Sequence, residues 1–330
     1  MSGAVWLNGE FEMKHIGIIG TGGVGGYFGG RLVTGLSGES GIQVHFIARG
    51  PHLQAIREHG LLLSTVSDEE RICRPATATD RIEELPDLDV CLICVKSYDL
   101  QGVLHRLKQV ITRDSIIIPL LNGVDIYSRI RSVIQESIVF PGCVYVGTHI
   151  ERPGRIVQRG GLCQILFGKD PQNPGRSPGG IIDLFDRCCI AYRWLEDPNP
   201  EIWKKFLFIA SFGMAGACYG QTLGQMIADN QSRKDVKSMM HEIMKVAWNQ
   251  GIVLRSTIVE EAFQKAGQFP YEARCSFHRD YEQMDKPDER ELFGGTIIRL
   301  AESSGVAVPV TKRIYDDLNS MKKLSRETAV

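Results

Sequence analysis

Lys14-His-Ile-Gly-Ile-Ile-Gly20-Thr21-Gly22-Gly23-Val24-Gly25 is the stretch that decides the fold of this 330-residue chain. Its apolar run, residues 16–19, predicts a buried strand that leads into Gly20-x-Gly22-x-x-Gly25, after which we expect a helix. In such a fingerprint Gly20 permits a tight turn, Gly22 lets the backbone approach a pyrophosphate, and Gly25 lets helix and strand pack closely. Because a helix N-terminus offers unpaired N–H groups to phosphates, residues 20–25 are the predicted binding loop for a dinucleotide.

Composition and charge exclude several classes of protein. The chain is 43% hydrophobic and 23% charged, as soluble globular proteins are, and its net charge of −1 gives no general attraction to nucleic acid or an anionic membrane. No apolar run approaches the roughly 20 residues of a membrane helix, and the N-terminus does not resemble a secretory signal. We therefore expect a cytoplasmic protein with no nucleic-acid or membrane partner, and residues 1–12 as an unstructured extension.

The nine cysteines are scattered along the chain and do not form a metal-binding pattern. Cys91 and Cys94 make a CxxC, but they lie in the predicted strand 90–95, where residues three apart point to opposite faces. No second CxxC or pair of histidines completes a zinc site. We expect buried thiols in a reducing cytoplasm and no metal.

The second strand, predicted over Gln43–Ile47, bears on the choice of cofactor. It ends in Ala48-Arg49, whereas NAD-preferring proteins of this fold carry an acidic residue there for the ribose hydroxyls. The planar guanidinium of Arg49 can instead grip a 2′-phosphate bidentately. The sequence therefore favours NADP(H) over NAD(H); a solvated surface arginine is the alternative.

Two more polar side chains follow predicted buried strands. Lys96 comes after the apolar strand 90–95, and Asn122 follows the strand 116–121. Since the carboxyl ends of parallel strands face the ligand crevice, both residues are candidates for contact with cofactor or substrate. A lysine at a helix start and an ordinary Asn-Gly turn are the alternatives.

The pattern changes from mixed to helical near Asp197-Pro-Asn-Pro200. Strands are predicted over 138–150 and 164–168, and they finish near Trp194. Beyond the boundary the apolar spacing predicts helices over 202–217, 235–250, 256–265 and 291–303. The fold class is therefore α/β, with an N-terminal Rossmann-type dinucleotide-binding domain at residues 13–197 and a C-terminal all-α substrate and catalytic domain at residues 198–330.

The order and spacing of these motifs resemble the ketopantoate reductase (2-dehydropantoate 2-reductase) family over nearly the whole chain. The residues that carry the resemblance are Gly20-x-Gly22-x-x-Gly25, Lys96, Leu121-Asn122-Gly123, Pro153-Gly154, Gly168, Trp203-x-Lys205, Ser276, Pro287-Asp-Glu289 and Gly305-x-x-x-Pro309. The resemblance implies NADPH-dependent reduction of ketopantoate to pantoate, a step of pantothenate and coenzyme A biosynthesis.

The resemblance also implies the catalytic residues. Lys205 matches the lysine that donates a proton to the forming alkoxide, while Lys204 points about 100° away around the helix and is expected in solvent. Glu289 matches the glutamate that holds the substrate hydroxyl and orients the lysine, with Glu291 as a less favoured occupant. Asn122 matches the asparagine beside nicotinamide and lysine.

Binding roles are implied in the same way. Ser276 matches the serine that binds substrate oxygen, and Arg49 and Lys96 match the positions that hold the adenosine phosphate. The glycine loop of residues 20–25 completes the predicted NADP-binding set.

Four positions depart from the family, which carries asparagine at each: Ile209, Gly213, Ala273 and Gly294. An unpaired buried polar partner typically costs about 1–3 kcal/mol, so these changes bear on recognition of a hydroxylated acid. Three explanations stay open: Arg274 replaces a carboxylate ligand, the protein reduces another and more apolar 2-oxo acid, or it binds nucleotide without catalysis. The sequence also leaves a homodimer open.

Overall fold

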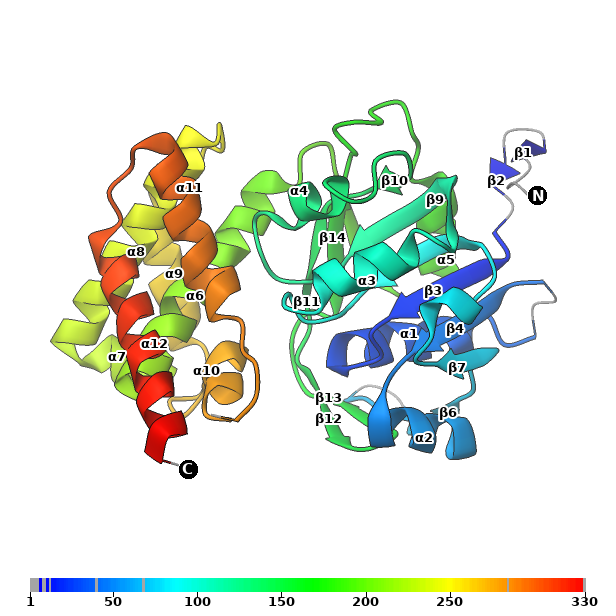
Figure 1. The fold of residues 1–330 in the computed structure, drawn as a ribbon, viewed down its shortest axis with the longest axis horizontal. Helices are drawn as coiled ribbons and strands as arrows, with labels where there is room; N and C mark the ends of the chain where they lie inside the picture. Colours follow the sequence, from blue (N-terminus) through cyan, green and yellow to red (C-terminus); the bar gives the residue numbers. More distant parts are fainter. Residues whose placement is uncertain are drawn as a thin grey trace. The chain divides into compact units, whose positions relative to one another are not determined.

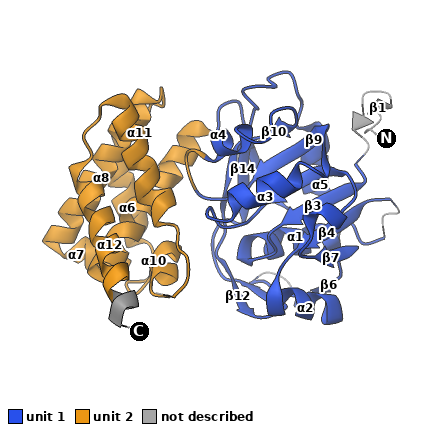
Figure 2. Cartoon of the chain, in the orientation of Figure 1, with its two compact units in different colours: residues 1–122, 126–198 blue, residues 123–125, 199–330 orange. Residues whose placement is uncertain are grey.

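The structure, a computed structural model, describes residues 6–7, 10–11, 13–38, 41–66, 69–283 and 285–328. The chain divides into two compact units, shown in different colours in Figure 2. Unit 1 comprises residues 1–122 and 126–198, and unit 2 comprises residues 123–125 and 199–330. In the part of the chain that is described, no helix is both long and apolar enough to span a bilayer.

Unit 1 is the α/β half that the sequence predicts (Figure 1). Its strands are β1 (Trp6–Leu7), β2 (Glu10–Phe11), β3 (His15–Ile19), β4 (Gln43–Ile47), β5 (Leu61–Ser64), β6 (Arg71–Cys73), β7 (Thr77–Thr79), β8 (Leu88–Ile93), β9 (Ile111–Pro119), β10 (Ile138–Val139), β11 (Gly142–Tyr145), β12 (Thr148–Arg152), β13 (Arg155–Gln158), β14 (Gln164–Gly168) and β15 (Ala191–Leu195). Its helices are α1 (Gly23–Gly35), α2 (Gly50–His59), η1 (Ile82–Glu84), α3 (Leu100–Leu107), α4 (Ile126–Arg131) and α5 (Gly179–Arg187).

The main sheet of unit 1 has six strands in the order β10-β9-β8-β3-β4-β7, and every neighbouring pair is parallel. Within this sheet β3 comes first along the chain; β4 then pairs with one side of β3, and β8 later pairs with the other side. The connections therefore change direction at β3, and a crevice for ligands is expected at the carboxyl end of such a switch point. The predicted binding loop, residues 20–25, begins at that end.

Helix α1 is rich in glycine because it packs against two sheets at once. A Cβ on Gly29 would stand 2.8 Å from the Phe46 ring of the main sheet, and one on Gly26 would stand 2.5 Å from Ile156 of β13. Strands β13 and β5 belong to a second sheet of order β12-β13-β5-β6. Helix α1 thus packs closely against both sheets.

Two expectations for unit 1 are corrected. The strand predicted over residues 138–150 is three short strands that belong to three different sheets: β10, β11 and β12. Pro141 lacks the N–H that a continuous ladder needs, and a Cβ on Gly147 would come within 2.6 Å of the Arg159 carbonyl oxygen. Within the extension predicted to be unstructured, β1 pairs with β2 as an antiparallel ribbon; the other residues of 1–12 lie outside the described ones.

Unit 2 is all-helical in its described residues, as predicted. Its elements are α6 (Asn199–Tyr219), α7 (Leu223–Ala228), α8 (Asn230–Asn249), α9 (Ile258–Gly267), α10 (Ser276–Tyr281), the π-helix η2 (Glu291–Gly295), α11 (Thr296–Ser304) and α12 (Pro309–Thr328). The helix predicted over residues 291–303 is corrected in one respect, because its first turn is π-helical. Helices α7, α10 and α12 have no counterpart in the prediction.

Helix α6 forms the centre of unit 2. It contacts α7, α8, α10, α12 and η2, and most of its side chains from Ile202 to Ala217 are buried. A helix that is apolar around its whole circumference belongs in a core. A polar residue within such a helix is therefore a candidate for a functional role, and Lys205 is such a residue.

Candidate functional site

The predicted cofactor residues of unit 1 follow four adjacent strands of the main sheet. In the order β9-β8-β3-β4, the residues after the strand ends are Asn122, Lys96, the loop from Gly20 and Arg49. The carboxyl ends of these parallel strands lie at one edge. The sheet therefore brings together four segments that are far apart in sequence.

The glycine loop has a tight turn at Gly20 and close packing at Gly25, as predicted. Gly20 has a φ of +96°, which favours glycine, and its N–H and that of Thr21 donate to the Ile47 carbonyl oxygen at 3.1 and 2.8 Å. A Cβ on Gly25 would lie 2.1 Å from the Gly20 carbonyl oxygen, whereas a Cβ on Gly22 would meet no atom within 4 Å. Gly25 thus serves the packing of the protein itself, and the space at Gly22 is open to a ligand.

His52, which no motif marked, holds this loop from the side. Its Nδ1 accepts the Gly154 N–H at 3.0 Å, so the proton is on Nε2, which lies 2.8 Å from the Thr21 carbonyl oxygen. Burial lowers the pKa of His52, in keeping with this neutral form. The Pro153-Gly154 motif therefore helps to shape the binding loop, and sequence alone could not reveal it because the partners are 102 residues apart.

Arg49 extends from the end of β4 with its side chain 75% exposed. Its guanidinium forms an ion pair with Asp99, which is 27% exposed, at 2.5 Å from Nη2 to Oδ2. Asp99 stands three residues after Lys96, just before α3. The cationic fork is thus held at the strand end, where the 2′-phosphate was predicted to bind.

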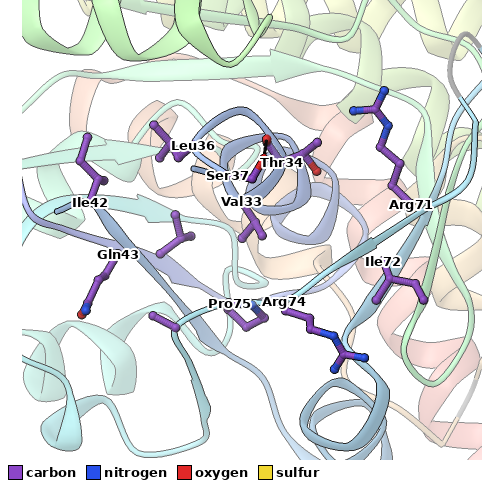
Figure 3. Close-up of a pocket in the computed structure, with 12 residues that line it drawn as sticks. Val33, Thr34, Leu36, Ser37, Ile42, Gln43, Arg71, Ile72, Arg74 and Pro75 are labelled. Atoms are coloured by element: carbon purple, nitrogen blue, oxygen red, sulfur yellow. Dashed lines mark hydrogen bonds between the residues drawn. The ribbon is translucent and has the colours of Figure 1, made fainter. Parts of the chain in front are cut away.

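A groove of about 640 Å³ lies elsewhere on unit 1 (Figure 3). Its lining comes from the last turn of α1, the amino end of β4 and residues 71–76. Those parts face away from the carboxyl strand ends, so the groove is not the dinucleotide site. Among the described residues, no group of three or more His, Cys, Asp or Glu side chains could hold a metal ion.

In unit 2, three aromatic rings join the elements that carry the predicted catalytic residues. Phe206 follows Lys205 on α6, Phe277 follows Ser276 on α10, and Phe293 lies in η2, four residues after Glu289. The ring centroids of Phe206 and Phe277 lie 5.8 and 5.4 Å from that of Phe293. All three rings are buried.

This aromatic cluster (Phe206, Phe277 and Phe293) fixes the three elements to one another, because aromatic contacts at these distances stabilise specific geometries. Lys205 is half-buried and Glu289 is buried, while Ser276, the first residue of α10, is exposed. The sequence placed these residues 84 positions apart at most; the cluster explains how they come to occupy one region of the unit.

Three further residues named in the sequence analysis have charged neighbours in the structure. Lys204 forms an ion pair with Glu261 at 3.4 Å rather than standing free in solvent. Arg274, the suggested substitute carboxylate ligand, is paired with Glu282. Glu291, the less favoured alternative to Glu289, is bound by Arg299 and accepts from the Tyr315 hydroxyl at 2.6 Å.

The positions that lack the family's asparagines have different surroundings. A Cβ on Gly294 would stand 2.5 Å from the Tyr315 ring and 2.7 Å from the Met214 methyl group, so a larger side chain there would require these two side chains to move. A Cβ on Gly213 would face Phe277 at 3.4 Å. Of the remaining two, Ile209 is half-buried on the Lys205 face of α6, and the Ala273 carbonyl accepts the Leu223 N–H.

The segment that follows Asn122 belongs to unit 2, which the sequence did not indicate. Gly123 has a φ of +124°, and Asp125 accepts a hydrogen bond from the Thr296 hydroxyl at 3.3 Å. Arg299 lies 4.0 Å from the same carboxylate. Asn122 is therefore the last residue of its unit before a three-residue segment docked on α11.

Known proteins match both units of the chain. The family description "Ketopantoate reductase PanE/ApbA" matches residues 16–172, and "Ketopantoate reductase PanE/ApbA C terminal" matches residues 197–322. The uncharacterized oxidoreductase YkpB of Bacillus subtilis is 25% identical over 91% of this chain and 96% of its own length.

Two solved structures have the same fold. The 2-dehydropantoate 2-reductase of Porphyromonas gingivalis W83 is 27% identical, with a TM-score of 0.77 over 93% of this chain and 99% of that one. A D-mandelate dehydrogenase, solved with NADH and anilino(oxo)acetate, is 19% identical, with a TM-score of 0.82 over 94% of this chain and 98% of that one. Since the two family matches together span both units, the chain belongs to the ketopantoate reductase family of oxidoreductases.

Proposed function

We propose that the protein is an NADPH-dependent reductase that converts ketopantoate to pantoate, in the pathway to pantothenate and coenzyme A. The observation that carries the proposal is the aromatic cluster, which joins the elements of Lys205, Ser276 and Glu289 in one unit. We assign them as the proton donor and two polar ligands for the 2-oxo acid. The same residues retain the family's motif.

The residues of unit 1 fit a nicotinamide dinucleotide phosphate. The open space at Gly22 suits a pyrophosphate, the first N–H groups of α1 suit its charge, and Arg49 suits a 2′-phosphate. The cofactor, when bound, supplies a hydride to the carbonyl carbon of the acid. Lys96 and Asn122 complete the set that we assign to its binding.

The side chains of unit 2 manage the proton and the substrate. Lys205 donates a proton to the carbonyl oxygen as it becomes an alkoxide, and as a cation it stabilises the charge that develops there. The Glu289 carboxylate accepts a hydrogen bond from the substrate hydroxyl and orients Lys205. Ser276 donates a hydrogen bond to a substrate oxygen.

The test is the rate of NADPH oxidation by purified protein with ketopantoate, with NADH measured in parallel. We expect turnover that saturates with ketopantoate and is faster with NADPH. Protein that binds NADPH but reduces no 2-oxo acid would contradict the proposal and favour a non-catalytic nucleotide-binding role.

A second candidate, reduction of a more apolar 2-oxo acid, is favoured by the filled position at Gly294. Tyr315 and Met214 occupy the space of a hydrogen-bonding side chain there, and Gly213 and Ile209 offer no polar atoms of their own. The D-mandelate dehydrogenase of the same fold was solved with the aromatic acid anilino(oxo)acetate and with NADH. We therefore propose an apolar 2-oxo acid as the alternative substrate.

Two acids that differ by a single hydroxyl group separate the candidates. Ketopantoate and 3,3-dimethyl-2-oxobutanoate share every other atom. A site that hydrogen-bonds a substrate hydroxyl rejects the analogue without it by roughly 10⁴-fold, whereas an apolar pocket discriminates by only about 10²-fold or less. A kcat/KM ratio above about 10³ in favour of ketopantoate supports the first candidate on that scale, and a ratio near or below one supports the second.

Arg49→Ala is expected to raise the dissociation constant of NADPH by roughly 10- to 100-fold, because a charge-assisted hydrogen bond contributes about 1.5–3 kcal/mol. The dissociation constant of NADH, which lacks the 2′-phosphate, should change little. Fluorescence titration of the same variant with both dinucleotides provides its own control. Equal losses for the two would contradict the assignment of Arg49 to the 2′-phosphate.

A further inference from the structure

Helix α12 contains a fully buried lysine that the proposed mechanism does not use. The Lys322 side chain is only 2% exposed, and its Nζ lies 2.5 Å from Oδ2 of Asp288, which is also 2% exposed. The same Nζ donates to the Lys286 carbonyl oxygen at 2.6 Å. Lysines are almost never fully buried unless paired, so this cation ties the segment before Glu289 to α12.

Arg290 ties the other side of Glu289 to the same helix. Its Nε donates to Asp288 Oδ1 at 2.8 Å. Its Nη1 donates to the Leu318 carbonyl oxygen at 3.2 Å and to Asn319 Oδ1 at 2.8 Å. Both chain neighbours of Glu289, Asp288 and Arg290, are therefore bound to α12.

Tyr281 forms the apolar floor under the two cations. Lys322 Nζ and Arg290 Cζ each lie 5.7 Å from the centre of its ring, and its hydroxyl donates to the Leu318 carbonyl oxygen at 2.7 Å. Burial raises the pKa of Tyr281 to about 12, so the hydroxyl remains a donor at neutral pH. Burial alone would raise the pKa of Asp288, but the hydrogen bonds from Lys322 and Arg290 lower it.

Such a cluster fixes the arrangement of the backbone more than it stabilises the fold. A buried ion pair is often no more stabilising than apolar residues of the same size, and its best-attested use is to fix one arrangement. The backbone here needs fixing, because the π-helix η2, a rare conformation found often at functional sites, starts two residues after Glu289. Glu289 itself is 4% exposed, so its carboxylate direction depends on this backbone.

We propose that Asp288, Arg290 and Lys322 form a clamp that positions Glu289 for the reduction, with Lys322 as a positioning residue on the C-terminal helix. The inference rests on the proposed function of Glu289. It predicts that the clamp, and not merely the fold, sets how well the enzyme uses its 2-oxo acid.

The experiment compares four variants with the wild-type protein, one of which, Lys322→Arg, keeps the cation. Lys322→Met leaves Asp288 without its lysine and should destabilise the protein. Asp288→Asn combined with Lys322→Met removes one charge of each sign, so it should recover melting temperature while the contact between residue 288 and α12 through Lys322 stays broken. Lys323→Met, the exposed neighbour on α12, is the control.

Hydrogen exchange read by mass spectrometry tests the clamp without reference to activity. In the double variant, amides of residues 286–295 should exchange at least about tenfold faster, which corresponds to about 1.4 kcal/mol of lost protection. Exchange elsewhere and the dissociation constant of NADPH should stay as in the wild type. Unchanged exchange over 286–295 would overturn the proposal.

Kinetics then separates positioning from mere support of the fold. In the double variant kcat/KM for the 2-oxo acid should fall at least tenfold although stability has recovered. In the single variant Lys322→Arg, which keeps the cation, kcat/KM should lie between the values of the double variant and the wild type. Wild-type kcat/KM in the double variant would overturn the positioning role. If the wild-type protein reduces no 2-oxo acid, the proposed function fails and with it the catalytic purpose, whereas the exchange result still decides whether the clamp exists.

Discussion

Replacing Lys205 with alanine is expected to lower kcat by about 10²- to 10⁴-fold, the usual contribution of a positioned general acid. The dissociation constant of NADPH should stay nearly unchanged, because the proposed role of Lys205 is proton transfer to the substrate and not cofactor binding. Stopped-flow measurement of NADPH oxidation, with a fluorescence titration of the same protein, checks both quantities. Loss of turnover together with loss of NADPH binding would indicate a general structural defect.

Lys204→Ala is the matched control for this prediction. Both lysines lie on the first turns of α6, and both are half-buried, so removal of either side chain perturbs the helix similarly. Lys204 is paired with Glu261 at a partly exposed site, where an ion pair is worth about 0–1 kcal/mol. We expect the kcat of Lys204→Ala to stay within about twofold of wild type, since the lost ion pair has no part in the proposed reaction. Equal losses in the two variants would remove Lys205 from the mechanism.

The part of the fold that local sequence determines was predictable. The glycine loop lies between β3 and α1 as its spacing indicates, and β14 covers Gln164–Gly168 as predicted. A tight turn at Gly20 and a close approach at Gly25 are requirements of the backbone itself, and only glycine meets them. The change from mixed to helical structure near Pro198 follows from periodicity and proline content.

The parts that depend on distant contacts were not predictable. The segment 138–150 contains Pro141 and Gly147, but its sequence does not reveal that β10, β11 and β12 belong to different sheets. The docking of Asp125 on α11 depends on Thr296, 171 residues away. The clamp around Glu289 likewise needs α12, which the sequence pattern did not predict although Pro309 stands at its first position, where proline is favoured.

The second large effect is expected at Gly25, where alanine should damage the protein before any ligand binds. Its Cβ would lie 2.1 Å from the Gly20 carbonyl oxygen and 3.0 Å from the Cys94 Cβ. Overpacking of this kind costs about 1–3 kcal/mol or more, and for a unit of this size each kcal/mol lowers the melting temperature by about 2–4 °C. Thermal unfolding without cofactor should reveal the loss. An unaltered melting temperature would mean that the loop can relax away from α1.

Gly22→Ala should produce the opposite pattern, and the contrast tests what the fingerprint is for. No atom lies within 4 Å of its added Cβ, and its φ of −82° is one that alanine adopts freely, so the cofactor-free protein should lose less than about 1 kcal/mol from the changed helix cap. The new methyl group stands where a pyrophosphate must approach the backbone, so the dissociation constant of NADPH should rise at least about tenfold, or 1.4 kcal/mol. NADPH should then raise the melting temperature of the wild type but not of this variant. If instead the variant binds NADPH normally, the pyrophosphate does not approach at Gly22, and the cofactor-binding role of the loop would need a different geometry.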